Sequence, residues 1–214
     1  MDTSARDFRR FDEDDDSAFY SFPRRVVHID NDAIAALTRL YAALVPAEGR
    51  VLDLMSSWRS HLPASFNGTA IGLGLNAVEM AENPQLATAV VHDLNREPGL
   101  PFGDAAFDAV VCAVSVQYLT RPLDVFREVR RVLRPDAPFI VSFSNRCFPD
   151  KAVTRWRVTD DHEHVEVVTA YFADSAEPSR AWTAAETFAH TPPLGDPLYT
   201  VWALVSWSGA GQTS

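Results

Sequence analysis

The chain has 214 residues, and 47% of them are hydrophobic, which is enough apolar material for one domain with a substantial core. Its 29 acidic residues outnumber its 19 basic residues, and the net charge of -10 has the wrong sign for neutralising phosphates, so we expect no nucleic-acid partner. The two cysteines, Cys112 and Cys147, show neither a disulfide framework nor metal spacing, which is typical of the reducing cytoplasm.

The N-terminal segment is polar and acidic through about Asp16, and it resembles neither a signal peptide nor a transit peptide. Its composition predicts that it is mobile when the protein is empty. Phe19 and Tyr20 follow, and they bury apolar surface only if this segment docks on the domain. We therefore interpret residues 1–24 as an arm, either a lid or a tail, and residues 25–214 as one domain. No apolar run is long enough to cross a bilayer, and we expect no membrane partner.

An apolar run that ends on an acid and breaks into a small polar loop occupies residues 50–63, RVLDLMSSWRSHLP. A short buried strand is predicted there, with Asp53 at its carboxyl end and Met55, Ser56 and Ser57 in the turn that leaves it. In an open α/β sheet, a ligand is expected in the crevice outside the carboxyl ends of the strands. We therefore expect this loop to form the floor of a nucleotide-like pocket.

Strand and helix patterns alternate on both sides of this loop. A helix capped by Asp30 or Asn31 precedes the first strand. After Pro63 there is little room for a long helix before the second strand. Thr120 is the predicted cap of a later helix that has Pro122 at its first position. The further predicted strands span residues 70–73, 87–92, 109–114 and 138–143, and a short helix spans residues 77–82.

The C-terminal part has a different pattern. An amphipathic helix at about residues 162–172 is followed by two predicted strands, 182–188 and 198–207. The loop between these strands, TPPLGDP, contains no helix and therefore joins an antiparallel pair rather than another parallel crossover. The sequence thus predicts an α/β fold with a doubly wound, mostly parallel sheet and an antiparallel hairpin at its edge.

A resemblance to a known family is carried by four segments in order: VLDL, the strand end GLGLN, VHDLNREPGLPFGDAAFDAVVC, and YLTRPLDVFREVRRVLRPDAPFIVSFSN. In these segments the chain resembles the class I S-adenosylmethionine-dependent methyltransferases, in particular the small-molecule type 11 group. The resemblance covers roughly residues 33–207. It implies a Rossmann-like fold, S-adenosylmethionine as cofactor, and methyl transfer to a small-molecule acceptor.

The opening motif departs from the family pattern. The family's D-x-G-x-G-x-G loop lets the backbone approach the cofactor closely, but its glycine positions are here Met55, Ser57 and Arg59. The acid that commonly binds the ribose hydroxyls falls on Gly74. Serine hydroxyls in the same loop are able to donate to a carboxylate, and DLMSSWRSHLP resembles the loop of a variant subgroup. The resemblance favours a variant pocket; the alternative is a catalytically silent S-adenosylmethionine-binding or protein-interaction module.

The resemblance also implies a set of residues around the cofactor. Asp53 either orders the turn after its strand or receives the ammonium group of the cofactor through water. Asp93 matches the position whose carboxylate accepts from the adenine amino group, with the Leu94 N–H donating to the ring; loop capping is the alternative for Asp93. Asn76 either contacts the ribose or caps a helix. The expected cofactor-binding residues are Asp53, Met55, Ser56, Ser57, Leu73, Asn76, Asp93, Leu94 and Ser115.

Three residues are expected on the acceptor side because they follow strand ends. Tyr118 follows the fourth strand, Arg146 follows the fifth, and His61 lies on the loop after the first. Methyl transfer from a sulfonium requires an aligned acceptor, and a base only if the acceptor loses a proton, so these three form the expected catalytic set. Arg146 would bind a carboxylate or phosphate of the acceptor in bidentate fashion. The alternatives are a packed ring for Tyr118 and a surface ion pair for Arg146.

Two other clusters receive a structural interpretation. Residues 160–164, DDHEH, contain five possible metal ligands, but at a helix start these side chains diverge and complement the helix dipole, so we expect no metal. Ser60 and His61 are adjacent on a loop and no G-x-S-x-G motif is present, so we do not expect a hydrolase. The sequence leaves both a monomer and a homodimer open.

Overall fold

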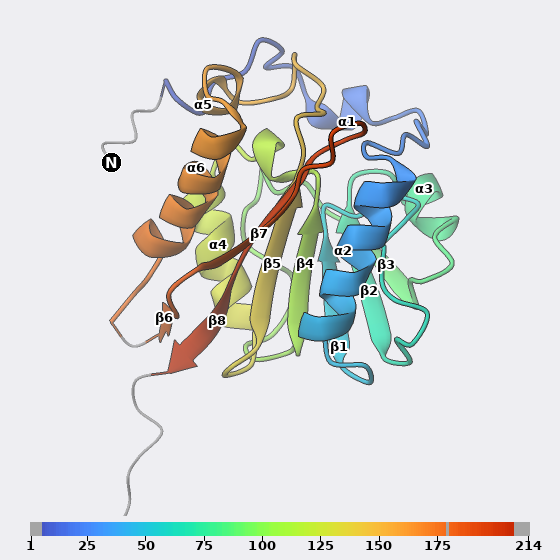
Figure 1. The fold of residues 1–214 in the computed structure, drawn as a ribbon, viewed down its shortest axis with the longest axis vertical. Helices are drawn as coiled ribbons and strands as arrows, with labels where there is room; N and C mark the ends of the chain where they lie inside the picture. Colours follow the sequence, from blue (N-terminus) through green and yellow to red (C-terminus); the bar gives the residue numbers. More distant parts are fainter. Residues whose placement is uncertain (1–5, 179, 208–214) are drawn as a thin grey trace, which may run out of the picture.

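The structure, a computed structural model, describes residues 6–178 and 180–207. Its strands are β1 (Arg50–Leu54), β2 (Thr69–Gly74), β3 (Thr88–Val91), β4 (Ala109–Ala113), β5 (Pro138–Phe143), β6 (Arg180–Trp182), β7 (Glu186–His190) and β8 (Leu198–Trp207). Within these residues they form one sheet in the order β3-β2-β1-β4-β5-β8-β6, and β7 also pairs with β8 (Figure 1).

The first five strands of this order are parallel to one another, and β8 is antiparallel to β5, β6 and β7. This arrangement confirms the predicted mostly parallel sheet with antiparallel strands at one edge. The predicted strand at 182–188 is wrong in one respect, because it is two strands, β6 and β7. Thr183 interrupts the ladder: its N–H donates to the Leu204 carbonyl, and its hydroxyl takes the place of a backbone acceptor for the Leu204 N–H.

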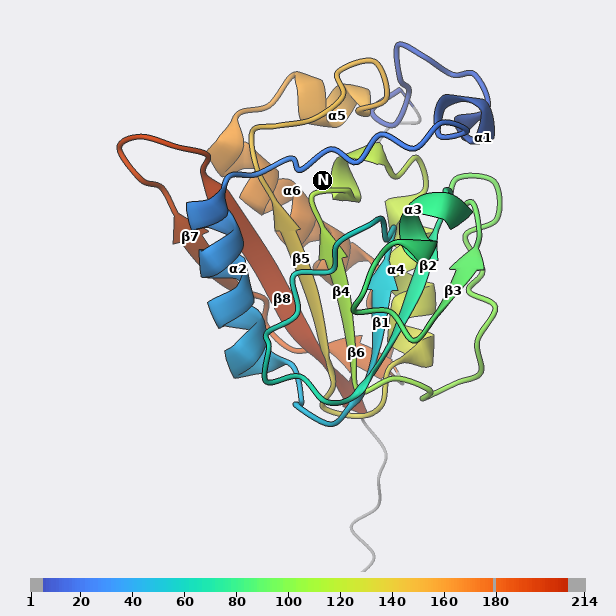
Figure 2. The same cartoon turned by 90° about the vertical axis from the view of Figure 1, so that its right-hand side faces the viewer.

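Helices cover both faces of the sheet. They are α1 (Asp16–Phe19), α2 (Asn31–Leu44), α3 (Ala77–Ala81), the 3-10 turn η1 (Val116–Tyr118), α4 (Pro122–Val132), α5 (Thr154–Arg157) and α6 (Asp161–Asp174). Figure 2 shows α2 on one side of the sheet and α4 with α6 on the other. None of the helices in the described ranges has both the length and the apolar character needed to span a bilayer.

The helix α2 begins where the sequence predicted and buries one apolar face. The carboxylate of Asp30 accepts from the N–H of Ala33, which caps the helix. Leu37 and Tyr41 are completely buried against the sheet, in a core that includes Ile140 of β5. Full burial of such large apolar side chains contributes roughly 1.5–3 kcal/mol each, so α2 is fixed mainly by its packing on the sheet.

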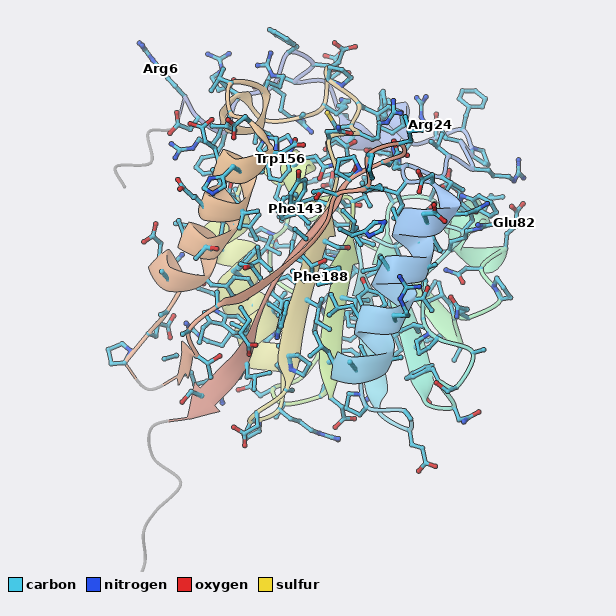
Figure 3. The ribbon with its side chains drawn as sticks, viewed as in Figure 1. Arg6, Arg24, Glu82, Phe143, Trp156 and Phe188 are labelled. Carbon is cyan, nitrogen blue, oxygen red and sulfur yellow. The ribbon has the colours of Figure 1, made fainter. Side chains whose placement is uncertain are left out.

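The opposite face of the sheet holds an aromatic core. The ring of Phe126 on α4 packs 4.9 Å from Phe139 and 5.0 Å from Phe172, centroid to centroid, in edge-on geometry. Near the carboxyl end of β5, the ring of Phe143 lies 5.1 Å from the ring of Trp156, centroid to centroid, and both residues are labelled in Figure 3. These contacts join α4, α5 and α6 to the sheet as one layer.

The predicted cap of α4 is wrong by one residue. Arg121 occupies the N-cap position, and its side chain makes no capping bond, whereas Pro122 stands at the first helical position as predicted. Thr120 has a different partner: its N–H and its hydroxyl both donate to the amide oxygen of Asn95, at 2.8 and 3.1 Å. The Thr120 hydroxyl therefore bonds to Asn95 in the loop after β3 and does not cap α4.

All parallel strands present their carboxyl ends at the same edge of the sheet. The arm, of which residues 6–24 are described, crosses this edge together with α5 (Figures 1 and 2). Between β1 and β2 the chain forms no helix, in agreement with the little room left by the sequence. Instead the loop after β1 binds back to the sheet, with the Ser56 N–H donating to the Leu73 carbonyl at 2.8 Å.

Candidate functional site

A cavity of about 140 Å³ lies between the carboxyl ends of the parallel strands and the arm. The loops that follow β1, β2, β3 and β4 form its walls. Every residue of the expected cofactor set lines this cavity, and so do Tyr118 and His61. Arg146 is the expected site residue that does not. The topology thus brings together side chains from four separate strand ends, in the crevice where open α/β sheets bind their ligands. The roles of the individual residues remain predictions.

Asp53, at the end of β1, is almost completely buried, and serine hydroxyls hold one of its oxygens. Ser56 Oγ and Ser60 Oγ each donate to Asp53 Oδ2 at 2.6 Å, and the side-chain amide of Asn83 donates to Ser60 Oγ. Burial raises the pKa of Asp53 to about 6, although the two hydroxyl hydrogen bonds act in the opposite direction. Asp53 therefore orders the turn through serine hydroxyls, and its Oδ1 has no hydrogen bond within the described residues.

The loop after β1 has an unusual backbone for a segment, residues 55–67, that contains no glycine. Met55 and His61 have φ values of 58° and 57°, in the left-handed region that side chains with a Cβ seldom adopt. Val114, on the cavity wall after β4, also has a positive φ, 51°, which is rarer still for a β-branched residue. Residues held in such conformations cluster at functional sites because the surrounding structure must enforce them. Of the six non-glycine residues with positive φ in the described ranges, these three line the cavity.

Gly74, at the end of β2, is packed directly against this loop. A Cβ at position 74 would lie 2.3 Å from the carbonyl oxygen of Ser56 and 3.2 Å from Met80 Sδ. Any side chain at this position would therefore displace the backbone of the loop. The variant loop and the missing acid at Gly74 are thus one structural feature, which the sequence presented as two separate departures.

Asp93 and Leu94 form the wall that follows β3. One oxygen of Asp93, Oδ1, accepts from the N–H groups of Asn95 and Arg96 at 2.9 and 3.3 Å, so the loop-capping interpretation is correct for that oxygen. Within the described residues Asp93 Oδ2 accepts no hydrogen bond, and the residue lines the cavity. The two interpretations are compatible, because one oxygen orders the loop and the other is available to an adenine amino group.

The helix α3 adds a residue that the sequence analysis missed. Asn76 caps this helix by accepting from the N–H groups of Val78 and Glu79, and its amide nitrogen donates to the Tyr20 carbonyl of the arm. Glu79 lines the cavity and is 6% exposed. Its Oε1 accepts from the Arg24 N–H at 2.6 Å, and its Oε2 accepts from Ser57 Oγ at 2.5 Å. The spacing Asn-x-x-Glu is a capping-box signal that could have drawn attention to Glu79.

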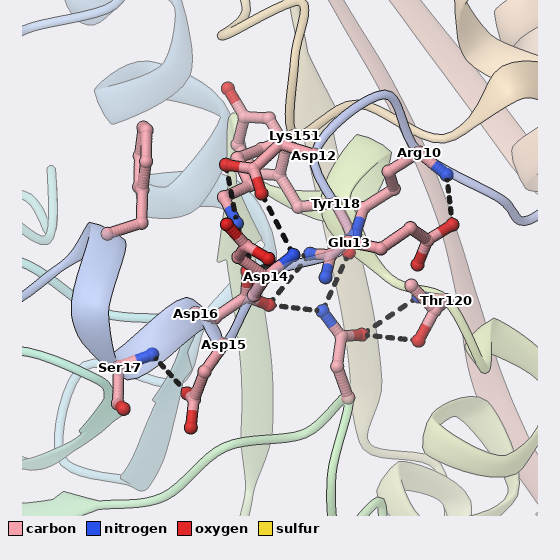
Figure 4. Close-up of polar contacts among 12 residues, drawn as sticks. Arg10, Asp12, Glu13, Asp14, Asp15, Asp16, Ser17, Tyr118, Thr120 and Lys151 are labelled. Carbon is pink, nitrogen blue, oxygen red and sulfur yellow. Dashed lines mark hydrogen bonds and ion pairs between the residues drawn. The ribbon is translucent and has the colours of Figure 1, made fainter.

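The arm is held over the cavity by a cluster of buried charges. Lys151 Nζ lies 2.9 Å from Asp12 Oδ2 and 3.1 Å from Asp16 Oδ1, and it donates to the Asp14 carbonyl (Figure 4). Arg10 Nη1 lies 2.7 Å from Asp16 Oδ2. The acidic run that suggested a mobile tail thus has specific cationic partners, and Arg10 and Asp16 line the cavity themselves.

Asn95 connects this cluster to the loops of the sheet. Its amide nitrogen donates to Asp16 Oδ2 at 2.9 Å and to the Tyr118 carbonyl at 3.0 Å, while its oxygen accepts from Thr120 (Figure 4). One side chain therefore links the arm, the loop after β3 and the segment after β4. The position of the arm is coupled to two of the loops that form the cavity.

Aromatic side chains form the wall beside the arm. The Tyr118 hydroxyl accepts from the Phe148 N–H at 2.8 Å, and its ring is stacked on Phe148 with a centroid distance of 6.2 Å. The ring of His28 meets Phe148 edge-on at 4.9 Å. Burial raises the pKa of Tyr118 and lowers the pKa of His28, so at neutral pH the tyrosine is protonated and the histidine is uncharged. Only the histidine is suited to accept a proton.

His61 lies on the cavity wall formed by the loop after β1. Burial, together with the nearby positive charge of Arg59, lowers its pKa to about 4. His61 is therefore uncharged at neutral pH. Its backbone carbonyl accepts from the Thr38 hydroxyl at 3.2 Å, which ties this strained position to α2.

Arg146 forms a surface ion pair, which was the alternative to an acceptor-binding role. Its side chain is 64% exposed and its Nε donates to Asp196 Oδ1 at 2.8 Å. It does not line the cavity. Asp196 lies in the loop between β7 and β8, so the hairpin draws the guanidinium to the surface. This geometry gives no support to Arg146 as the anchor of an anionic acceptor.

The acidic segment before α6 has a structural role. Asp160 accepts from the N–H groups of His162 and Glu163, and the Glu163 carboxylate accepts from the Asp160 N–H, which completes a capping box. His164 is stacked on Trp156 with a centroid distance of 3.8 Å. In the part of the chain that the structure describes, no group of three or more His, Cys, Asp and Glu side chains is arranged to hold a metal ion.

Comparisons with known sequences identify the segment that contains these loops. Residues 57–141 match the family model described as the methyltransferase domain, Methyltransf_11. A segment of 66 residues, 31% of the chain, is 33% identical to the biotin biosynthesis bifunctional protein BioHC of Teredinibacter turnerae. The matched segment spans only 12% of that protein.

Solved structures show the same fold over most of the chain. A chain of the complex between the Haloferax volcanii Trm112 methyltransferase activator and a methyltransferase aligns with a TM-score of 0.57 and 16% identity, covering 84% of this chain and 91% of that one. The [4+2]-cyclase SpnF aligns with a TM-score of 0.59 and 15% identity, covering 90% of this chain and 92% of that one. An S-adenosylmethionine-dependent methyltransferase from Thermotoga maritima aligns with a TM-score of 0.56 and 12% identity, covering 80% of this chain and 88% of that one. At these identities the likeness establishes the fold.

Proposed function

We propose that this protein transfers a methyl group from S-adenosylmethionine to a small molecule, which is supported by the methyltransferase-domain match over residues 57–141 and by the fold that the chain shares with solved methyltransferases. One observation carries the proposal. Asp53, near the end of β1, and Asp93, after β3, line the same cavity, and each keeps one carboxylate oxygen without a hydrogen bond to the described residues. These are the groups that would hold the ammonium and the adenine at opposite ends of the cofactor.

The residues present fit the cofactor chemically. Burial raises the pKa of Asp53 to about 6, and no cation among the described residues offsets this effect. A bound ammonium group would supply that missing positive charge and favour the carboxylate form. At the other end, Asp93 Oδ2 is an acceptor for the exocyclic amine, and Leu94 is buried beside it as an apolar surface for the ring.

The cofactor supplies a methyl group that is already activated by the sulfonium, so the protein's task is to position the acceptor and exclude water. Tyr20 of the arm, with Tyr118 and His28, forms the wall on the side where an acceptor would approach. Tyr118 stays protonated and contributes an aromatic surface. His28 is uncharged, and neither ring nitrogen has a hydrogen bond within the described residues, so it is able to take a proton from an acceptor hydroxyl or amine.

The size and covering of the cavity support a small acceptor. The arm contributes Arg10, Asp16, Tyr20 and Arg24 to the lining, and the buried charge cluster fixes it in place. An acceptor must therefore fit between the arm and the cofactor. A folded protein or a nucleic-acid duplex would require the whole arm to leave, and the charge of -10 disfavours nucleic acid further.

Calorimetric titration tests the proposal directly. Purified protein should bind S-adenosylmethionine and S-adenosylhomocysteine with dissociation constants of about 1–100 μM, corresponding to roughly 5–8 kcal/mol of binding free energy. No heat at millimolar ligand would favour an interaction module on the same fold. The acceptor is then sought by incubating the protein with S-adenosylmethionine carrying a tritiated methyl group and fractionated metabolite pools. Tight cofactor binding without any transfer across those pools would favour a silent cofactor-binding module.

A further inference from the structure

We propose that Glu79, on the first turn of α3, provides the carboxylate that binds the ribose hydroxyls of S-adenosylmethionine. The inference rests on the proposed function and adds a residue to the same site. In the Rossmann arrangement an acid after a strand accepts hydrogen bonds from the ribose hydroxyls. In this chain the end of β2 carries Gly74 instead.

Position 74 has no space for an acid. The Cβ of any side chain there would lie 2.3 Å from the Ser56 carbonyl oxygen, a distance that real Cβ atoms do not show. The loop cannot retreat easily, because the Ser56 N–H is bonded to the Leu73 carbonyl and its hydroxyl to Asp53. A carboxylate for the ribose must therefore come from elsewhere on the cavity wall.

Glu79 is placed where the middle of the cofactor would lie. In the sheet, β2 stands between β1, which carries the buried Asp53 next to its last residue, and β3, which leads to Asp93. The chain passes from β2 directly into α3, with Asn76 as the cap and Glu79 three residues later. A cofactor with its ammonium at Asp53 and its adenine at Asp93 has its ribose between them, in front of α3.

The carboxylate also has unused hydrogen-bonding capacity. Each oxygen accepts one bond, Oε1 from the Arg24 N–H and Oε2 from Ser57 Oγ, and each retains a second acceptor site. Glu79 is 6% exposed, and no cationic side chain of the described ranges pairs with it at ion-pair distance. A buried carboxylate without a cation is stabilised by additional donors, and a ribose diol offers two.

The contacts of Glu79 extend to the arm. Arg24 belongs to the arm, and the same α3 also holds it through Asn76 and the Tyr20 carbonyl. A ribose bound at Glu79 would therefore touch a carboxylate that already fixes the end of the arm. The site joins cofactor binding to the wall on the acceptor side.

A cycle of two proteins and two ligands tests the proposal. The wild type and Glu79→Gln are each titrated with S-adenosylhomocysteine and with its 2′,3′-dideoxy analogue. We expect Glu79→Gln to weaken S-adenosylhomocysteine binding about ten- to hundredfold, the effect of losing hydrogen bonds to a charged acceptor. The same substitution should change the affinity for the dideoxy analogue less than threefold, because that ligand has no hydroxyls for the carboxylate.

Equal losses for both ligands would overturn the inference, because they would show that Glu79 acts through the structure of the loop. Failure of the wild type to bind S-adenosylhomocysteine would overturn the proposed function and this inference with it. Glu82→Gln is the matched control, because Glu82 lies one turn further along and is paired with Arg25 at the surface. The Glu82→Gln protein should bind both ligands as the wild type does. If Glu79→Gln does not fold, Glu79→Asp replaces it in the same cycle. The shorter side chain keeps the carboxylate but moves it away from the ribose.

Discussion

Lys151 Nζ lies 3.1 Å from the Asp16 carboxylate, and both side chains are almost completely buried, at 1% and 5% exposure. The lysine follows the end of β5 and the aspartate begins α1, so this contact fastens the arm to the sheet. An ammonium group taken out of water needs strong partners, and Asp12, the Asp14 carbonyl and Asp16 provide three. The charge cluster therefore anchors the arm to the segment that follows β5.

Lys151→Met should release the arm. The substitution leaves Asp16 with Arg10 and Asn95 but removes the only cation that reaches Asp12 within the described residues, and losing one partner of a buried pair costs about 3–5 kcal/mol. Limited digestion with chymotrypsin, which cuts at aromatic residues such as Phe19 and Tyr20, should become much faster. Arg9→Met, whose ion pair with Glu13 is exposed, should digest as the wild type does. Unchanged resistance in the lysine variant would show that the arm is held by other contacts.

Asp53→Asn should stabilise the ligand-free protein at neutral pH. The native pKa of about 6 is raised above the ordinary 3.8, so the folded protein holds this proton more tightly than the unfolded chain does. The corresponding stability is fully present below pH 3.8 and is lost as the pH rises through about 6, an amount of about 3 kcal/mol at 1.36 kcal/mol per pKa unit.

Asparagine has no such proton, and its oxygen still accepts from Ser56 and Ser60. In urea unfolding at a series of pH values, the variant should exceed the wild type at neutral pH and match it near pH 3.8. Because the pKa values of His28 and His61 are lowered, both proteins lose stability as the pH falls below 6.5. This loss is the same in the wild type and the variant, so it cancels in the difference between them. A difference that does not vary with pH would show that Asp53 is not the titrating group. The same variant should bind S-adenosylmethionine more weakly, for want of the carboxylate.

Asp93→Ala should weaken cofactor binding by about 1.5–3 kcal/mol, the range for a hydrogen bond with a charged partner. Part of any loss would arise from the loop, because Asp93 Oδ1 also caps Asn95 and Arg96. The hypoxanthine analogue S-inosylhomocysteine separates the two effects, since it has no exocyclic amine. The variant should lose affinity for S-adenosylhomocysteine and little for the inosine ligand. Glu97→Ala, in the same loop and exposed, is the control.

His28→Phe should lower kcat by roughly a hundredfold or more while leaving S-adenosylhomocysteine affinity within about twofold, provided the acceptor must lose a proton. Phenylalanine keeps the edge-on contact with Phe148 and removes only the nitrogens. In the wild type the neutral imidazole is the active form, so the rate should be constant at neutral pH and fall once the pH drops well below 6.5, since burial lowers the His28 pKa. A variant with wild-type kcat would remove His28 from the chemistry.

Gly74→Ala should destabilise the fold by about 1–3 kcal/mol, because the added methyl meets the Ser56 carbonyl. Thermal unfolding measures the change. Gly103→Ala is a suitable comparison, since nothing lies within 4 Å of a Cβ there. Gly74→Asp, which restores the family's usual acid, should be at least as unstable and should not bind S-adenosylhomocysteine more tightly. Improved binding by that variant would indicate a loop that yields easily.

The mostly parallel sheet and the location of the cavity could be predicted because local sequence patterns determine them. Apolar runs such as residues 51–54 and 138–143 alternate with helical periods, and parallel strands necessarily align their carboxyl ends. Residues next to strand ends, such as Asp53 and Asp93, therefore fall at the cavity without any knowledge of tertiary contacts. Arg146 also follows a strand end, but its partner Asp196 comes from a distant hairpin, and no local pattern reveals that pair.

The features that could not be predicted from the sequence depend on contacts between residues that are far apart in the chain. The composition of the acidic arm indicated mobility because its binding partner, Lys151, lies far along the chain. Thr120 was predicted as a helix cap, but Arg121 holds the N-cap position and the Thr120 hydroxyl donates to Asn95. Glu79 has an ordinary place in a helix, and its importance comes from facing the cavity, which depends on how α3 lies on the sheet.

The arm has a consequence for the timing of a catalytic cycle. Its side chains line the cavity, and it is attached through Asp16, Asn76 and Glu79 to the loops that would grip the nucleoside. Departure of the spent nucleoside would require several of these attachments to break together. Opening of such covers takes microseconds to milliseconds and limits the overall rate of many enzymes. We therefore expect turnover to be set by product escape, and solvent viscosity to slow it even when the transfer step itself is fast.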